Sequence, residues 1–513
     1  MAELRIVKKD DLTAIADKMR EKLGGSETVN FPDGFVSSVE NVYSKSTGNM
    51  LDRTFTELNL ENSEIDDTNS WSKYALAGAN KLQKIILPSK GGAQKLPSYC
   101  FLNCNKLKTV ETSSDNKWNF TVSNDSIFEN CFSLEEIDFL NDSNNGIGNR
   151  TFYNCTSLKN VKPHYGETIY TSDGSHYEER VFCKNVGQYA FYNCTSLTKI
   201  DWLSNETDRN ATQYIYNYAF ANSGITKIDL RKCNDLRIYS NAFENCNKLT
   251  EVILHPNTEI NEKSFSNCKN LKSVTFDDAD KKIDFGGKIK NYAFENCSSL
   301  EEIYIADGIG EIGNYAFSGC SSLKKVSFPY NMTTIGRCAF EGCPIEEIEF
   351  RDIDKSHLVT IDSFAFKDCN LSSITIPRNC QTIGTSAFYG NTNLTSFNIA
   401  DVKNSRLKTI SDYAFRGCST LRNFTVPSNV TKIGNYAFAY TGISYINFLP
   451  TTPPTLGSGF LYRTNNLEYI YVPKDENGGS YYVGLYSGVS GLSSSTYSKL
   501  ITEWSKTEET TTE

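Results

Sequence analysis

Hydrophobic positions recur along most of this chain in one fixed pattern. The pattern is A-F-x-x-C-x-x-L-x-x-[IV]-x-[FIL], and a clear copy that begins at Ile312 reads IGNYAFSGCSSLKKVSFPYNMTT. Within this copy Val326 and Phe328 alternate with polar residues, which is the period of a half-buried strand, and Leu323 leads into that strand. The A-F-x-x-C segment is too short for a stable helix and indicates a tight turn. Each copy is therefore predicted to hold one turn and one short strand.

The phenylalanine of the pattern anchors about sixteen copies of roughly 22–29 residues, of which the first is degenerate and has Leu76 in its place. One copy cannot bury its own apolar face, whereas stacked copies bury a continuous core. The sequence therefore predicts a mainly β solenoid of about 16 coils over residues 44–473, with its longest insertion between Cys155 and Tyr189. The anchoring residues are Phe101, Phe128, Phe152, Phe191, Phe220, Phe243, Phe265, Phe294, Phe317, Phe340, Phe366, Phe388, Phe415, Phe438 and Phe460.

Most of the 16 cysteines follow the anchoring phenylalanine by three residues. Ser, Asn or Thr replaces the cysteine in four copies, at Ser223, Asn391, Thr441 and, one residue further from its phenylalanine than in the others, Thr464. A position that accepts these residues indicates packing, so we expect buried free thiols and no disulfide or metal site. The cysteines of this ladder are Cys104, Cys131, Cys155, Cys194, Cys246, Cys268, Cys297, Cys320, Cys343, Cys369 and Cys418.

This motif resembles the BspA-like class of leucine-rich repeats, which is also called the Treponema pallidum type. The resemblance covers approximately residues 50–473. It implies a leucine-rich-repeat solenoid, and it implies a surface or secreted protein that binds host or matrix components. It names no partner.

Composition and motifs argue against several other classes of protein. The net charge of −9 disfavours a nucleic-acid groove, which needs a basic stripe. No apolar run is long enough to span a membrane, and residues 1–18 lack the apolar core of a secretory signal. Hydrolase, nucleotide-binding and zinc-protease motifs are missing, and acidic pairs such as Glu301-Glu302 occupy the same repeat position as Lys324-Lys325. We therefore expect no enzymatic activity and no cofactor.

Ligand contacts are expected at the outward positions of the repeated strand. In the last two copies these positions hold Tyr445, Asn447, Tyr469 and Tyr471, and an earlier copy presents Tyr304. Tyrosine combines a rigid apolar face with a polar tip, which suits contact with a saccharide or a protein. The alternative is that some of these rings lie under a C-terminal cap that shields the last coil.

Both ends of the chain depart from the repeat. Residues 1–43 are predicted to form a small α-helical module, with a second helix that starts near Phe35. The pattern LTAIADxxREKxGG…FPDGFxxxVxxV in these residues resembles a module of structural and tail-associated proteins of phages that infect Gram-positive bacteria. The module would dock the chain onto a particle or would only cap the first coil. The first helix should present Leu12, Ile15, Met19 and Leu23 on one face.

At the other end of the chain, residues 474–513 are expected to form a cap, with a short helix near residues 497–504, and a disordered tail.

Together these features predict a non-catalytic binding protein. The first hypothesis is a fibre or receptor-binding protein on the exterior of a phage virion, which is held to other virion proteins through the N-terminal module. The alternative is a bacterial cell-surface or secreted adhesin of the BspA-like kind. In both cases the expected partner is a host cell-surface protein or glycan, without nucleic-acid binding or membrane insertion. Self-association into a homo-oligomer is left open.

Overall fold

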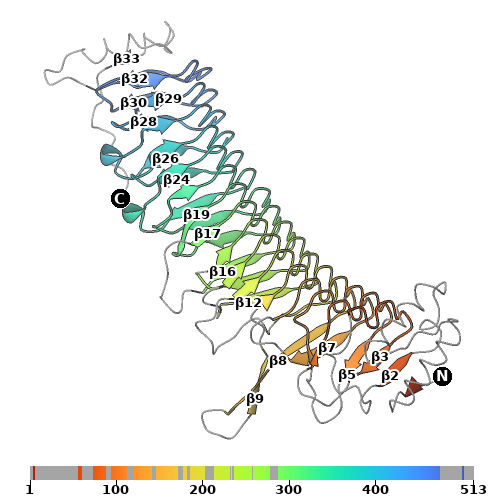
Figure 1. Cartoon of the computed structure of the whole chain (residues 1–513). Coiled ribbons are helices and arrows are strands. Elements are labelled where there is room, and N and C mark those ends of the chain that lie inside the picture. The colour runs from red at the N-terminus through yellow and green to blue at the C-terminus, as the bar shows by residue number, and fades with distance from the viewer. Residues whose placement is uncertain are drawn as a thin grey trace. The chain divides into compact units, whose positions relative to one another are not determined.

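The structure is a computed structural model, shown in Figure 1. It describes residues 4–5, 56–59, 73–87, 94–111, 120–140, 146–170, 177–181, 185–200, 213–231, 236–256, 258–277, 287–473 and 500–501, together with Trp202 and Cys233. The chain divides into two compact units, Met1–Thr258 and Glu259–Glu513. The described residues form a leucine-rich-repeat β-solenoid of about 15 turns with almost no helix, which confirms the predicted solenoid.

The first unit is built from short parallel strands that lie side by side in successive turns (Figure 1). Its sheets have the orders β1-β2-β3-β5, β4-β6, β7-β8-β9, β10-β11-β13 and β12-β14. The strands are β1 (Leu4–Arg5), β2 (Glu57–Asn59), β3 (Lys84–Ile86), β4 (Gln94–Lys95), β5 (Thr109–Glu111), β6 (Phe120–Thr121), β7 (Glu136–Leu140), β8 (Asn160–Tyr170), β9 (Tyr177–Val181), β10 (Asn185–Val186), β11 (Gln213–Ile215), β12 (Lys227–Leu230), β13 (Leu236–Ile238) and β14 (Glu251–Leu254).

The second unit repeats two parallel strands per turn. A short strand precedes the A-F-x-x-C turn, and these strands pair in the order β15-β17-β19-β21-β23-β25-β27-β29-β31, which we call the short-strand ladder. Its members are β15 (Glu259–Ile260), β17 (Gly287–Ile289), β19 (Ile309–Ile312), β21 (Thr334–Ile335), β23 (Thr360–Ile361), β25 (Thr382–Ile383), β27 (Thr409–Ile410), β29 (Lys432–Ile433) and β31 (Thr455–Leu456).

A longer strand follows each turn and ends in the [IV]-x-[FIL] part of the motif. We call the solvent-facing side of these strands the strand face. They form sheets in the orders β18-β20-β22, β24-β26 and β28-β30-β32-β33. The strands are β16 (Ser273–Phe276), β18 (Glu302–Tyr304), β20 (Lys325–Phe328), β22 (Glu347–Phe350), β24 (Ser373–Ile376), β26 (Ser396–Ile399), β28 (Asn423–Val426), β30 (Tyr445–Phe448), β32 (Tyr469–Tyr471) and β33 (Leu500–Ile501), and two 3-10 turns are η3 (Ile353–Lys355) and η4 (Val402–Asn404).

The A-F-x-x-C turns also bond to one another through the main chain. The N–H groups of Tyr315 and Phe317 each donate to a carbonyl of the next turn, at 2.8 Å. This pairing needs left-handed backbone on both sides of the phenylalanine, at Tyr315 (φ 58°) and at Gly319 (φ 76°). The residue two places after the phenylalanine is therefore usually Asn or Gly, since these tolerate positive φ best. The turn that the pattern predicted is thus a third ladder of parallel hydrogen bonds.

Within each unit the core holds a stack of the anchoring phenylalanines. All fifteen are buried, and in each unit successive rings lie nearly parallel, as between Phe294 and Phe317 (5.2 Å) and between Phe317 and Phe340 (5.1 Å). Such offset stacking adds roughly 0.5–1.5 kcal/mol per pair beyond the burial of area.

The prediction for Phe460 is wrong by one residue. The carbonyl of Phe460 accepts from the N–H of Phe438, as the carbonyl of Ala437 accepts from that of Phe415, so Leu461 stands at the anchoring position of that turn.

The ladder cysteines are buried free thiols, as the sequence predicted, and so are all fifteen cysteines that the structure describes. The structure adds a reason for the residues that replace them. The thiol of Cys343 donates to the carbonyl of Phe317 in the preceding turn (3.1 Å). The amide of Asn391 makes the same contact to Phe366 (2.8 Å), and the hydroxyl of Thr441 donates to Phe438 (2.8 Å). This position therefore favours a small residue that can donate a hydrogen bond to a buried carbonyl.

The insertion after Cys155 forms a β-hairpin that extends away from the turns of the first unit (Figure 1). Its first strand, β8, begins in the solenoid, where it pairs in parallel with β7, and then pairs antiparallel with β9 from Thr168 to Tyr170. The insertion is thus a continuation of one repeat strand.

The terminal predictions fall largely outside the described residues. Leu12, Ile15, Met19, Leu23 and Phe35 lie there, so the helical module remains a prediction. Leu4–Arg5 forms β1 and pairs in parallel with β2, which adds a strand to the first sheet. At the other end Leu500–Ile501 forms β33 on the edge of β32, where the sequence predicted a helix. Unpaired main-chain groups at that sheet edge favour an added strand over a helix.

The thiol ladder predicts a loss of stability at high pH. Burial raises the pKa of Cys104, Cys297 and Cys418 to about 12, whereas an unfolded thiol ionises near ~8.5. The stability that this shift contributes is complete below pH ~8.5 and is lost as the pH rises through the folded pKa, by ~1.4 kcal/mol per pH unit for each thiol. We expect the midpoint of guanidinium denaturation, measured with reductant, to fall steeply between pH 8.5 and 10.5.

A matched variant isolates the thiol contribution. Cys418→Thr places at this position a residue that the chain itself uses in two later turns. The slope of unfolding free energy against pH should then become shallower by about one thiol's share. A slope that is unchanged in this variant would show that other groups cause the alkaline loss.

Candidate ligand-binding surface

The strand face carries a row of paired charges in the middle of the second unit. In register across β18, β20 and β22 lie Glu302, Lys325 and Glu347, and the ammonium of Lys325 is 2.9 Å from the carboxylate of Glu347. One residue earlier, Lys324 faces Glu346 at 3.6 Å. The acidic pairs thus face lysines of the neighbouring turn, as expected for solvent-facing charge. Exposed pairs of this kind contribute little to stability, roughly 0–1 kcal/mol.

Tyr304 stands at the next outward position on β18 and is 45% exposed. The guanidinium of Arg351 lies 3.7 Å from the centre of its ring, close enough for a cation–π contact. Arg351 also forms an ion pair with Asp307 at 2.8 Å, and its side chain is only 15% exposed. Tyr304 is therefore a partly exposed ring held against a fixed cation, a rigid contact of the kind that binding surfaces favour.

A second aromatic group covers the last strands of the same face. Tyr445 and Tyr469 are partners on β30 and β32, and Asn447 and Tyr471 are the next outward pair. The ring of Tyr471 lies 5.9 Å from that of Tyr445, edge to face, and 6.0 Å from that of Tyr469. We call Tyr445, Tyr469 and Tyr471 the terminal tyrosine cluster.

The structure brings four of the five predicted contact residues to the surface. Tyr469 is 45% exposed, and Tyr445 and Tyr471 are half-buried. Asn447, which was expected to face outward, is only 6% exposed. Its partner on β32 is Tyr471, whose ring contacts that of Tyr445. Asn447 therefore offers almost no surface to a ligand, and ligand binding by the others remains a prediction.

A third group of tyrosines lies on the A-F-x-x-C turns, where no contact residue was predicted. The rings of Tyr413 and Tyr436 stack at 5.6 Å. The guanidinium of Arg416 lies 5.2–5.7 Å from the rings of Tyr389, Tyr413 and Tyr440. The sequence signal for these tyrosines is the recurring Tyr-Ala-Phe triplet. A residue two places before the buried phenylalanine lies on the outside of the turn.

Within the described ranges, no group of three or more His, Cys, Asp or Glu side chains could hold a metal ion. In the same residues, no helix has the length and hydrophobicity needed to cross a membrane.

A family model described as the BspA type leucine-rich repeat region, in six copies, matches residues 37–159, 180–285, 287–402 and 359–482. The chain belongs to the BspA-type leucine-rich repeat family. Proteins of this family are typically non-enzymatic binding proteins. The match begins at residue 37, and the phage-like resemblance of residues 1–43 gains no support from it.

Several solved structures are similar to this BspA-type chain. A leucine-rich repeat protein from Bacteroides ovatus shares 21% identity, over 79% of this chain and 82% of its own, with a TM-score of 0.47. A leucine rich cell surface protein from Faecalibacterium prausnitzii shares 20% identity, over 85% of this chain and 93% of its own, with a TM-score of 0.33. The Treponema pallidum leucine-rich repeat protein shares 20% identity, over 47% of this chain and 77% of its own, with a TM-score of 0.21. No curated protein matches the chain.

The two outermost tyrosines should differ in their effect on stability. Tyr469→Ala removes a ring that is 45% exposed and should change the free energy of unfolding by less than ~0.5 kcal/mol. Tyr471→Ala removes a half-buried ring that contacts two others, on a strand that β33 also pairs with, and should cost about 1–2 kcal/mol. Urea denaturation of both variants measures this difference. Equal destabilisation would mean that Tyr469 also serves packing.

Proposed function

We propose that this protein is a non-catalytic adhesion protein that binds a host cell-surface protein or glycan on its strand face. Membership of the BspA-type family supports a binding role. The observation that carries the proposal is the terminal tyrosine cluster, which gathers three rings on two adjacent strands where other turns place paired charges. Clustered exposed aromatic residues are the usual centre of a binding surface.

Tyr304 is proposed as a second contact on the same face. Its guanidinium partner restricts the ring, so little conformational entropy is lost when a ligand packs against it. The charged row at Glu302, Lys325 and Glu347 forms a polar rim, which suits specificity more than affinity.

The proposal is tested by binding of the full chain to arrays of glycans and of purified extracellular-matrix proteins. Tyr445→Ala and Tyr469→Ala should each weaken the binding found by about tenfold or more, the usual effect of losing a central aromatic contact. Tyr462→Ala is the matched control, because Tyr462 is 44% exposed but lies on a turn and not on the strand face. Binding that survives both strand-face substitutions and is lost in the control would overturn the proposal.

We propose the bacterial cell surface, or the medium around the cell, as the place where the protein acts. The second candidate is the exterior of a phage virion, and it is favoured by the phage-like pattern in residues 1–43. Fractionation separates the two: the first predicts the protein in cell-envelope or culture fractions of uninfected cells. Recovery only with purified phage particles would replace the first candidate by the second.

A further inference from the structure

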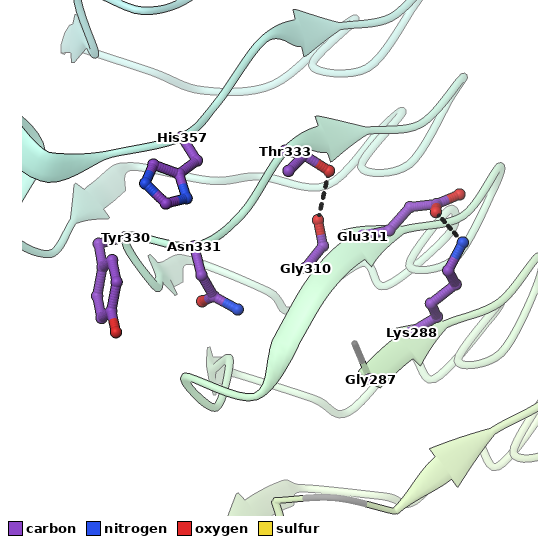
Figure 2. A pocket seen from close by; sticks show the side chains of 8 residues that line it. All are labelled: Gly287, Lys288, Gly310, Glu311, Tyr330, Asn331, Thr333 and His357. Carbon is purple, nitrogen blue, oxygen red and sulfur yellow. Dashed lines mark hydrogen bonds and ion pairs between the residues drawn. The ribbon is translucent and has the colours of Figure 1, made fainter. Parts of the chain in front are cut away.

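The second unit contains a hollow of about 620 Å³ at the start of the short-strand ladder. It is lined by Gly287, Lys288, Gly310, Glu311, Tyr330, Asn331, Thr333 and His357. Figure 2 shows Asn331 between Tyr330 and Gly310, with His357 nearby and the amide group directed into the space that these residues border. Its volume lies within the range of small-molecule sites, roughly 300–1,000 Å³.

The hollow exists because two successive turns lack a side chain at one repeat position. In the later turns, the residue just before each strand of the short-strand ladder carries a side chain. Main-chain hydrogen bonds align these residues in one column, which contains Thr333, Val359, Gln381 and Lys408. The column begins with Gly310, whose carbonyl accepts from the N–H of Thr333, and Gly287 lies one turn earlier. A bulge between Gly287 and Lys288 further interrupts the pairing of β17 with β19.

Packing does not require glycine at Gly310. A Cβ atom added there would meet only the main-chain oxygen of Asn331, at 3.7 Å, which is an ordinary contact. Its φ also lies outside the left-handed region. Glycine at this position therefore leaves open space that a side chain could occupy without strain.

Asn331 places an unsatisfied acceptor against this space. The residue is 8% exposed, and its side-chain oxygen has no hydrogen-bond partner among the described residues. A buried polar atom without a partner costs roughly 1–3 kcal/mol, so such atoms are uncommon unless a ligand or water completes them.

Two later asparagines show what is different about Asn331. Asn379 and Asn429 follow proline by two residues, as Asn331 does, in equivalent loops. Their amides donate to the carbonyls of Ser356 (2.6 Å) and Ser405 (2.7 Å) in the preceding turns. Each of those serines ends a 3-10 turn, η3 or η4. Among the described residues 287–330 no 3-10 turn precedes Asn331, and its side chain lines the hollow instead.

The remaining walls define the chemistry of a fitting ligand. Tyr330 and His357 form an edge-to-face aromatic pair, with ring centres 6.2 Å apart. Lys288 and Glu311 form an ion pair at 2.6 Å, so the rim carries no net charge from these two groups. An aromatic wall that accepts C–H groups, a buried acceptor and a charge-neutral rim suit an uncharged ring that carries hydroxyl groups.

We propose that this hollow binds one neutral sugar residue, with a sugar hydroxyl donating to the side-chain oxygen of Asn331. The site is separate from the terminal tyrosine cluster and does not depend on a ligand bound there. A free monosaccharide and the terminal sugar of a glycan share this chemistry.

Saturation-transfer NMR on the full chain, with glucose, galactose, mannose and N-acetylglucosamine as probes, tests the site. At least one sugar should bind, with a dissociation constant on the order of millimolar for so few contacts. Gly310→Leu fills the space, and Asn331→Leu removes the acceptor. Each should weaken binding by about tenfold or abolish it. Asn331→Leu should leave the melting temperature unchanged or raised, because it removes an unsatisfied buried atom.

The matched controls are Asn379→Leu and Val359→Leu, which make corresponding changes outside the hollow and should leave sugar binding intact. Tyr469→Ala should also leave it intact, so a failure of the strand-face proposal is distinguishable from a failure of this one. Binding that persists in Gly310→Leu overturns the proposal. Absence of transfer from every sugar also overturns it and indicates that Asn331 is satisfied by water only. Immobilised glycans that end in the preferred sugar, tested against the same variants, distinguish a glycan end from a free sugar.

Discussion

Parallel main-chain hydrogen bonds between successive turns set the distance at which every other group in this solenoid must repeat. Neighbouring strands lie roughly 4.8 Å apart, and residues at equivalent positions are therefore stacked directly on one another. That spacing suits the flat faces of aromatic rings, which explains why successive phenylalanine rings stack at 5.1–5.6 Å. It also suits amide groups: Asn130 donates to Asn103 at 2.8 Å, and Asn154 donates to Asn130 at 2.9 Å. Each interior position accepts a narrow range of residues because it must fit its own copies.

The same constraint leaves the outside of the repeat free to vary. On the strand face, paired charges in one region give way to Tyr304 and to the terminal tyrosine cluster in others, while the core beneath is unchanged. On the turns, tyrosines and Arg416 stack outside the phenylalanine ladder. A protein built this way can change what it binds without changing how it folds, which is a physical reason why repeat proteins serve as binding scaffolds.

Where one turn departs from the repeat, its effect can be identified by comparison with equivalent positions in neighbouring turns. Two glycines in place of side chains open a hollow, and the lack of a 3-10 turn leaves Asn331 without the carbonyl that Asn379 and Asn429 use. In a regular array, such differences stand out against equivalent positions one or two turns away. The binding surfaces proposed here all lie where the outward sequence changes from one turn to the next.

The sequence alone was sufficient for the solenoid, its buried phenylalanines and leucines, and the free thiols of its cysteine ladder. These follow from spacing within one copy, which is local information repeated many times. Only the tertiary structure decided what depends on neighbouring turns. Asn447 is buried beside its strand partner Tyr471, 24 residues later, and the restraint on Tyr304 comes from Arg351, two turns away. The donor role of the cysteines and the open space at Gly310 likewise require atoms that the sequence places more than 20 residues apart. No periodic pattern encodes such contacts, because each depends on which particular side chains meet across the stacked turns.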